Sequence, residues 1–414
     1  ASGSPDYGRD FETGFRTIDE ALAVAEFGQT IRVVEGTYSV AEARHALVTM
    51  KAGVDLIGGY GDDNGDGTYD EDPELYETVL NGFEDPANIG SARLVNTVVL
   101  GADETELRGF TVRGGSGQGA LRLGGGLAIQ GEASMVVDTC IVEFNRANSG
   151  SGIGMRPGTA LVIRESRIDN NGVGDGIFAD RASVRAMNTD VLLSGSYGIF
   201  VNNEDLIVDG GRFIGNDDVD IQVNGASATI SNAEFVGTAL RAPTPIRGSG
   251  VPGESDSFEI SNCVFDDTGQ TGVSVASAID VTDADVEVAS STIHATGSQA
   301  TFRGDGAFTV INSIVWNTQT DLPVFSTELT PASTAVTYSI VHEDIGGTGN
   351  IFAAPQVVNA ASGDLRLTSG SPAIDAADDT TAPLTDIVGT ARNTNGVPGS
   401  TPLPDIGAYE FVAD

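Results

Sequence analysis

The chain has 414 residues, of which 54 are glycine and only 6% are aromatic, a composition typical of a turn-rich fold with an aliphatic core. Its 59 acidic residues outnumber 21 basic ones, so the net charge is −38, and Lys51 is the only lysine. Such a field repels nucleic acid, anionic lipid and undecorated polyuronate, and it favours cations or high salt. We expect no membrane span, because no apolar stretch is long enough.

The first element that we expect is a helix from Thr17 to Gly28. Thr17 and Glu20 fit a capping box, Gly28 fits the C′ position, and Ile18 and Leu22 lie on one apolar face. Irregular strands are expected to follow at residues 30–34, 54–57, 78–80 and 96–100.

An acidic loop after the second of these strands carries oxygen-bearing groups at alternate positions. The candidate ligands are Asp62, Asn64, Asp66, Thr68 through its carbonyl, Asp70 and Asp72. With Gly67 at the bend, this spacing matches the start of an EF-hand-like calcium loop. Pro73 stands where such a loop carries its bidentate glutamate. We therefore weigh two interpretations, a Ca²⁺ site and an acidic loop without a ligand.

A six-residue motif recurs ten times between Phe110 and Asp344. It consists of a small or apolar residue, any residue, an apolar centre, two variable residues, and then Asn, Thr, Gly or Asp. The centres lie 21 to 30 residues apart and are Val112, Val142, Ile168, Leu192, Phe213, Phe235, Phe265, Ile293, Val315 and Val341. A repeat of this length with period-2 alternation predicts an all-β solenoid with one coil per copy.

The solenoid divides the chain into three expected regions. Residues 30–345 form the β-helix, residues 1–29 carry the helix that caps its N-terminal end, and residues 346–414 form an irregular C-terminal cap. Caps are needed because an open terminal coil exposes core side chains and unpaired strand edges.

The last motif position and the first one predict structural features of the core. Stacked polar side chains at the last position should hydrogen-bond from coil to coil; they are Asn145, Asn171, Asn216, Thr238, Thr268, Thr296 and Thr318. Cys140 and Cys263 share the first position five coils apart, which is about 24 Å at the strand spacing of a sheet. We therefore expect two buried free thiols.

One outward column suggests a ligand site. The residue after the apolar centre is Asp266, His294, Trp316 and His342 in four consecutive coils. Trp stacks on sugar rings, and His and Asp bind hydroxyls or move protons. The same column carries Leu193, Ile214 and Val236 in earlier coils, so the alternative is a packing seam covered by another segment.

Catalytic signatures are weak. Asn188-Thr-Asp190 followed by Asp217-Asp218 superficially resembles a polygalacturonase signature, but the accompanying Gly-His-Gly and Arg-Ile-Lys elements are missing. The repeat register also points Asp190 inward. A chance resemblance is the favoured interpretation, and whether the protein is an enzyme stays open.

Both ends of the chain carry motifs that resemble a known family. Near the N-terminus these are Phe15-Arg-Thr-Ile18, Glu35-Gly-Thr-Tyr38, Lys51-Ala-Gly-Val54 and Leu56-Ile-Gly-Gly-Tyr60; near the C-terminus they are Ser371-Pro-Ala-Ile-Asp375, Asp386-Ile-Val-Gly389, Arg392 and Asp405-Ile-Gly-Ala-Tyr-Glu410. The chain resembles secreted, pectate-lyase-like, right-handed parallel β-helix proteins with a choice-of-anchor Q type C-terminal region. The resemblance implies a clasp of Asp375, Asp386, Arg392 and Asp405 around the last turn.

Three functions are consistent with these features. The leading hypothesis is a secreted or cell-surface structural, adhesive or glycan-binding β-helix, stabilised by calcium, whose partner is a polysaccharide or cell-surface glycan. The first alternative is a polysaccharide lyase, hydrolase or epimerase that acts in a groove on the β-helix. The second is a self-assembling extracellular filament subunit, because a solenoid with open ends can stack head to tail. The small-residue start at Ala1 resembles a mature exported chain, so we expect an extracellular location.

Overall fold

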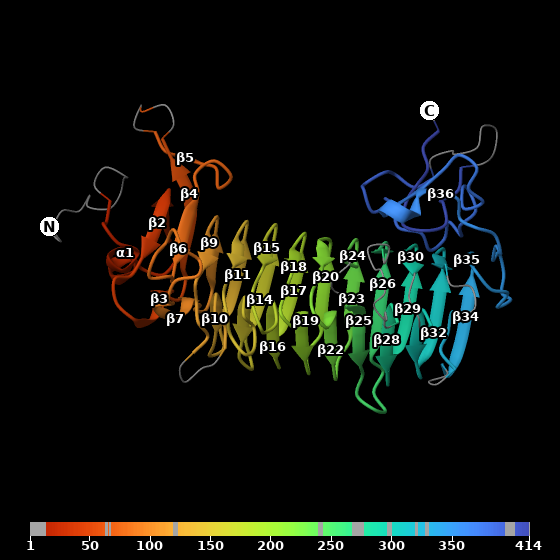
Figure 1. Cartoon of the computed structure of the whole chain (residues 1–414), viewed down its shortest axis with the longest axis horizontal. Coiled ribbons are helices and arrows are strands. Elements are labelled where there is room, and N and C mark those ends of the chain that lie inside the picture. Colours follow the sequence, from red (N-terminus) through yellow and green to blue (C-terminus); the bar gives the residue numbers. More distant parts are fainter. Residues whose placement is uncertain are drawn as a thin grey trace. The chain divides into compact units, whose positions relative to one another are not determined.

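The computed structural model describes residues 14–62, 65, 68–118, 123–238, 243–266, 277–295, 300–318, 322–327, 331–393 and 402–413. The chain forms two compact units, which divide between residues 201 and 202. Within each unit, parallel strands stack coil upon coil into three sheets, here called A, B and C (Figure 1). The predicted all-β parallel β-helix is confirmed.

The first unit begins with helix α1 (Ile18–Val24). Its sheet A contains β1 (Gln29–Val34), β4 (Val54–Gly61), β8 (Thr105–Arg108), β11 (Ser134–Asp138), β14 (Ala160–Arg164) and β17 (Ser183–Met187), with β5 (Asp70–Glu71) antiparallel to β4. Sheet B contains β2 (Gly36–Ser39), β6 (Thr78–Asn81), β9 (Thr111–Arg113), β12 (Ile141–Glu143), β15 (Arg167–Asp169) and β18 (Asp190–Leu192). Sheet C contains β3 (Arg44–Thr49), β7 (Val95–Leu100), β10 (Leu127–Ile129), β13 (Ile153–Met155), β16 (Ile177–Asp180) and β19 (Tyr197–Asn202).

The second unit repeats this arrangement. Its sheet A contains β20 (Leu206–Asp209), β23 (Ala228–Ser231), β26 (Ser257–Ser261), β29 (Asp285–Ala289), β32 (Ala307–Ile311) and β34 (Ser333–Thr337). Sheet B contains β21 (Arg212–Ile214), β24 (Glu234–Val236), β27 (Val264–Asp266), β30 (Thr292–Ala295), β33 (Ile314–Asn317) and β35 (Ile340–Val341). Sheet C contains β22 (Val219–Asn224), β25 (Thr244–Ser249), β28 (Ile279–Thr282) and β31 (Phe302–Gly304); β36 (Val357–Asn359), the 3₁₀ turn η1 (Ala360–Ser362) and β37 (Asp364–Leu367) follow.

The apolar centres of the motif line the core of each unit. In the second unit Phe213, Phe235 and Phe265 occupy matching places in β21, β24 and β27. Their rings stack with centroid separations of 5.0 and 4.7 Å. Each ring removes a large apolar area from water and aligns the next coil, so the same residues supply stability and register.

The predicted register is wrong by one residue in β18. Ile168 pairs with Val191, and it is Val191 that is buried. In other coils the centre is the third residue after a turn residue with positive φ, and here that residue is Asn188 (φ 43°). Because a one-residue slip exchanges the two faces of a strand, Asp190 lies half-buried on the outer face and does not point inward.

The turn between sheets A and B is therefore a repeated element in its own right. Asn232, Asn262 and Asn312 occupy it in three coils, with φ of 56°, 54° and 53°. Asparagine tolerates this left-handed conformation better than most residues, because its short polar side chain can hydrogen-bond locally. The turn sets where the next strand begins.

The N-terminal helix is shorter than predicted. The hydroxyl of Thr17 accepts a hydrogen bond from the backbone N–H of Glu20 at 3.2 Å, as expected for the N-cap. The helix ends at Val24 and does not reach Gly28, because Ala25 is extended (φ −61°, ψ 143°). This early end brings Gln29 opposite Val54 in sheet A.

The asparagine ladder is confirmed where the structure describes it most fully. The side-chain N–H of Asn171 donates to the carbonyl of Val142 at 2.7 Å, while its Oδ1 accepts from the backbone of Asn145 at 3.0 Å. Asn216 donates instead to Asp220, and the predicted ladder positions Thr268 and Thr296 lie outside the described residues.

The two cysteines are buried and free, as the spacing predicted. Burial raises the pKa of both Cys140 and Cys263 to about 12. Both thiols are therefore protonated and inert at neutral pH.

The C-terminal extension, residues 346–413 within the described chain, folds back on the second unit (Figure 1). The turn residue Asn312 donates to the carbonyl of Asp378 at 2.8 Å and accepts from its backbone N–H at 2.7 Å. Thr292 of β30 accepts from the N–H of Ala408 at 2.9 Å. The extension thus covers part of sheet B.

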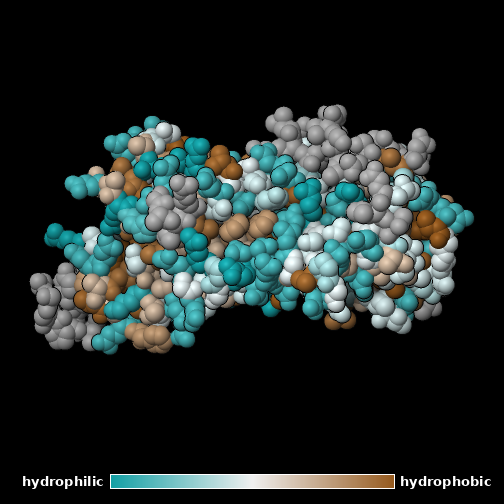
Figure 2. All heavy atoms as spheres, turned by 90° about the horizontal axis from the view of Figure 1, so that it is seen from below, coloured by the Kyte–Doolittle hydropathy of each residue, from teal (hydrophilic) through white to brown (hydrophobic). Residues whose placement is uncertain are grey.

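The surface agrees with the acidic composition. On the face shown in Figure 2, hydrophilic residues are spread along the whole visible surface, among residues of intermediate hydropathy and smaller hydrophobic groups.

Candidate functional site

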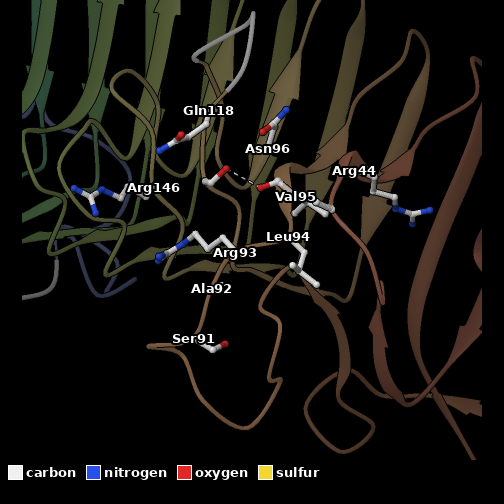
Figure 3. Close-up of a pocket in the computed structure, with 11 residues that line it drawn as sticks. Arg44, Ser91, Ala92, Arg93, Leu94, Val95, Asn96, Gln118 and Arg146 are labelled. Atoms are coloured by element: carbon white, nitrogen blue, oxygen red, sulfur yellow. Dashed lines mark hydrogen bonds between the residues drawn. The ribbon is translucent and has the colours of Figure 1, made fainter.

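A pocket of about 570 Å³ opens in the first unit beside β3 and β7 (Figure 3). Polar and basic side chains dominate its lining, which consists of Ala43, Arg44, Ser91, Ala92, Arg93, Leu94, Val95, Asn96, Ser116, Gln118 and Arg146. The volume falls within the range of small-molecule sites.

One wall of the pocket is the chain segment between β6 and β7. This segment folds back on itself, with an antiparallel bridge between Phe83 and Arg93 and a 2.8 Å hydrogen bond from the N–H of Glu84 to the carbonyl of Ala92. The fold-back places Arg93 at the pocket.

The opposite wall follows β9. The hydroxyl of Ser116 donates to the carbonyl of Val95 at 2.9 Å, which fixes this wall to β7. Gly115 is required here, because a Cβ at this position would lie 1.7 Å from the carbonyl oxygen of Gly125. The same residue accepts a hydrogen bond from the N–H of Arg146 at 3.0 Å, so the next coil contributes Arg146.

Arg93 and Arg146 give the pocket a positive charge. A guanidinium N–H of Arg93 donates to the carbonyl of Phe144 at 3.0 Å, and the group lies 4.9 Å from the ring centre of Phe83. Its Nε is buried without a hydrogen-bond partner. Burial, and next the nearby charge of Arg146, lower the pKa of Arg93.

The three arginines of the pocket differ in their partners. Arg44 pairs with Asp19 at 3.0 Å, whereas neither Arg93 nor Arg146 forms an ion pair with any described residue. Figure 3 shows Arg93, Arg146 and Gln118 extending to one side of the pocket and Arg44 to the other. Two guanidinium groups and an amide therefore lie on the same side of the pocket.

The predicted column of Asp266, His294, Trp316 and His342 exists in sheet B of the second unit. Asp266 pairs with His294, and His294 pairs with Trp316, in neighbouring strands. The rings of Trp316 and His342 meet edge to face with their centres 6.4 Å apart. The register thus brings together four residues that are distant in sequence.

Side chains from the C-terminal extension cover part of this column. Trp316 packs against a buried cluster that includes Leu367, Ile374 and Ile406. His294 is only 6% exposed, and burial lowers its pKa, an effect that Asp266 opposes. The geometry fits the packing seam weighed above, and ligand binding by these four residues stays a prediction.

The structure describes only part of the predicted calcium loop. Asn64 and Asp66 lie outside the described residues. Asp72 accepts hydrogen bonds from the backbone N–H groups of Glu74 and Leu75, both at 3.1 Å, so it stabilises a local turn. Within the described chain no three His, Cys, Asp or Glu residues form a metal cluster. Asp62, Thr68 and Asp70 remain candidate ligands together with the others, and the Ca²⁺ site stays a prediction.

The C-terminal clasp is a buried polar network. Arg392 donates to the carbonyl of Asp405 at 3.0 Å and to the side chain of Asn262 at 2.9 Å. Its charged partner is Glu410, at 4.0 Å. Asp405 accepts from the backbone of Asp375 at 2.7 Å. Asp386 also belongs to the network, and it accepts from the N–H of Glu410 at 3.0 Å.

A family model describes the part of the chain that contains the pocket. The model for a protein of unknown function, DUF1565, matches residues 6–217, which is just over half of the chain. The chain belongs to the DUF1565 family. The matched region of this family member includes Arg44, Arg93 and Arg146, whereas the column in sheet B lies beyond it.

Comparisons with other known proteins do not assign an activity to this chain. No curated protein matched the sequence. The pectate lyase Pel9A is 14% identical, with 99% of this chain and 94% of that chain covered and a TM-score of 0.49. The Agl-KA catalytic domain is 14% identical (86% and 64% covered, TM-score 0.41), and the catalytic domain of a GH87 alpha-1,3-glucanase is 11% identical (77% and 64% covered, TM-score 0.30). Likeness at this level assigns no activity to the chain. Among the described residues, no helix is long and apolar enough to cross a bilayer.

Proposed function

We propose that this protein is an extracellular or cell-surface β-helix that binds carbohydrate in the pocket of its first unit. The observation that carries the proposal is the lining: hydroxyl, amide and guanidinium groups converge on a cavity of about 570 Å³. A sugar offers hydroxyls that both donate and accept, which such a mixture of groups satisfies.

Two neutral side chains are suited to read sugar hydroxyls. Asn96 is held by the ring of His45, with 3.3 Å between its Nδ2 and the ring Nδ1, so its carbonyl oxygen is oriented. Gln118 is exposed at the rim and carries a second amide. Amide groups supply donors and an acceptor within one plane, which fits vicinal hydroxyls.

The chemistry of the lining favours binding over bond cleavage. Glycoside hydrolysis requires a pair of carboxylates across the scissile bond, and the lining residues include neither Asp nor Glu. We therefore assign the pocket a recognition role, and an activity screen with the same glycans tests the lyase, hydrolase and epimerase alternatives.

Two further features suit an exported protein. The thiols of Cys140 and Cys263 are buried and protonated, so an oxidising environment leaves them unchanged. The acidic surface keeps a long repeat protein soluble by charge repulsion.

The test is a glycan array followed by isothermal titration of the best ligand. We expect binding that is at least tenfold weaker in the double variant Asn96→Ala, Gln118→Ala, because both neutral amides are removed. Thr229→Ala, at an exposed strand position in the second unit, should bind like the wild type. Equal affinity in the double variant, or no glycan bound at all, contradicts the proposal.

A further inference from the structure

The lining of the pocket is positively charged, although the protein as a whole has a large negative charge. With 59 acidic and 21 basic residues, a carboxylate should be available for nearly every arginine. Several arginines of the first unit have such a partner: Arg108 pairs with Glu71 at 2.7 Å and Arg164 with Asp138 at 2.9 Å. Arg93 and Arg146 have no such partner among the described residues, although they lie in one pocket.

Two neighbouring guanidinium groups without a carboxylate partner raise the free energy of the folded protein. Arg93 is half-buried and its Nε is desolvated without an acceptor. The charge of Arg146 adds repulsion, which any negative group placed between the two would convert into attraction. The pocket is therefore electrostatically complementary to an anion.

We propose that the pocket holds one oxyanion carried by a sugar, a carboxylate or a sulfate, between Arg93 and Arg146. This inference rests on the proposed carbohydrate binding. Guanidinium groups form paired, charge-assisted hydrogen bonds with planar carboxylates and with the oxygens of tetrahedral anions. Asn96 and Gln118 are placed to bind the hydroxyls of the same sugar.

The net charge limits the ligand to an isolated acidic sugar. Charges interact strongly only within about 8 Å at physiological ionic strength, so a single anion in the pocket interacts mainly with the two arginines. A run of acidic sugars extends beyond the pocket, where the field of a chain with net charge −38 repels it. The site thus selects an acidic residue within, or at the end of, an otherwise neutral glycan.

Calorimetric titration with one matched set of ligands tests the inference. The set is a neutral tetrasaccharide ending in glucuronic acid, its methyl ester, its counterpart ending in a sulfated sugar, tetraglucuronic acid, and inorganic sulfate. We expect the single-acid form to bind about 10- to 100-fold more tightly than the ester. The sulfated form shows whether the pocket prefers a planar or a tetrahedral anion.

The salt dependence of binding distinguishes the positive charge of the pocket from the negative net charge of the whole chain. Raising the NaCl concentration should weaken binding of the single-acid ligand, because the contacts with the guanidinium groups are screened. It should strengthen binding of tetraglucuronic acid, because the repulsion by the whole chain is screened.

Arg146→Gln is the decisive variant, because Arg146 is exposed and its loss should leave the fold intact. It should lose the preference for the acid over the ester, because one of the two guanidinium groups proposed to hold the anion is removed. Arg185→Gln, at an exposed position in β17, is the matched control and should keep the preference.

The outcomes separate the two proposals. Equal binding of acid and ester overturns the inference while carbohydrate binding stands. An acid preference that survives Arg146→Gln also overturns the inference. Binding of inorganic sulfate without any glycan contradicts both proposals, and a failure of every probe to bind contradicts both as well.

Discussion

Asp220 shows how burial can shift the pKa of a single carboxyl group. It lies in β22, is 1% exposed, and accepts a hydrogen bond from Asn216 at 2.7 Å. Burial raises its pKa from 3.8 to about 8, and the hydrogen bond with Asn216 opposes the rise only in part. The carboxyl is therefore largely protonated at neutral pH in the folded protein.

The raised pKa predicts a loss of stability as the pH rises from about 4 to about 8. The folded state holds the proton more tightly than the unfolded state, so the stability that Asp220 contributes is complete below about pH 4 and falls as the pH rises through 8. Asp220→Asn should remove this slope, with a higher melting temperature than the wild type at pH 8.5 and a similar one at pH 4. Parallel melting curves across this pH range would contradict the assignment.

Arg392 is a buried charged group, unlike the neutral carboxyl of Asp220, and burying its charge is compensated by its hydrogen-bond and ion-pair partners. Removing it by Arg392→Met takes away the ion-pair partner of Glu410 and the donor to the buried carbonyls of Asp405 and Gly407. Loss of one partner of a buried pair typically costs about 3–5 kcal/mol. We expect a lower melting temperature and faster proteolysis of the C-terminal extension.

The control for Arg392 is Arg366→Ala. Arg366 pairs with Asp364 at 2.6 Å in the same extension, but its side chain is 65% exposed. Solvent screens such a pair, so no measurable loss of stability is expected. Equal effects of the two substitutions would contradict a clasp.

At the scale of elements, the polar ladder holds successive coils together. Asn171 joins Val142 and Asn145 through two hydrogen bonds and is fully buried. Asn171→Ala leaves a buried donor and acceptor unpaired, which should lower the free energy of unfolding by about 2–4 kcal/mol. Asn148→Ala, at an exposed position in the preceding coil, should change it by less than about 0.5 kcal/mol. Urea denaturation of both variants measures the difference.

The acidic loop before β5 gives a second prediction at this scale. If residues 62–72 bind calcium, millimolar Ca²⁺ should raise the melting temperature above that in EDTA, because a ligand that binds only the folded state stabilises it. Mg²⁺ at equal ionic strength controls for screening of the net charge, and Asp62→Asn with Asp70→Asn should abolish the Ca²⁺ effect. Identical melting in Ca²⁺ and EDTA would rule out the site.

The repeat made the strands predictable, because inward apolar residues must recur at the coil length. Sheet B was predicted in register except at β18, where Val191 and Leu192 are both apolar and alternation alone could not separate them. Counting three residues from the turn asparagine Asn188 would have resolved the choice. The helix end at Val24 depends on the pairing of Gln29 with Val54, a contact between residues that are distant in sequence and that no local pattern predicts.

The pocket was harder to predict than the strands. Arg93 and Arg146 are 53 residues apart in sequence. They lie in one pocket because the segment before β7 folds back and brings in Arg93, and because Arg146 follows Asn145 at the edge of the next coil. The usable signal was the place of Arg146, directly after a ladder position and therefore at a coil edge. The cover over the sheet B column was unpredictable in detail, because it comes from a non-repeating extension.

At the scale of the whole molecule, the sequence repeat and the net negative charge have separate roles. The repeat builds the sheets and their turns, and the net charge of −38 keeps polyanions away. The pocket departs from both patterns, since a non-repeating segment contributes Arg93, and neither Arg93 nor Arg146 has an ion-pair partner in the part of the chain that the structure describes. Carbohydrate binding in this pocket is the central claim.

The most direct test is a crystal structure of the protein with the tetrasaccharide that ends in glucuronic acid. The account predicts electron density for the acidic sugar in the pocket, with its carboxylate within hydrogen-bonding distance of Arg93 and Arg146. Density over Trp316 and His294 with an empty pocket would contradict it.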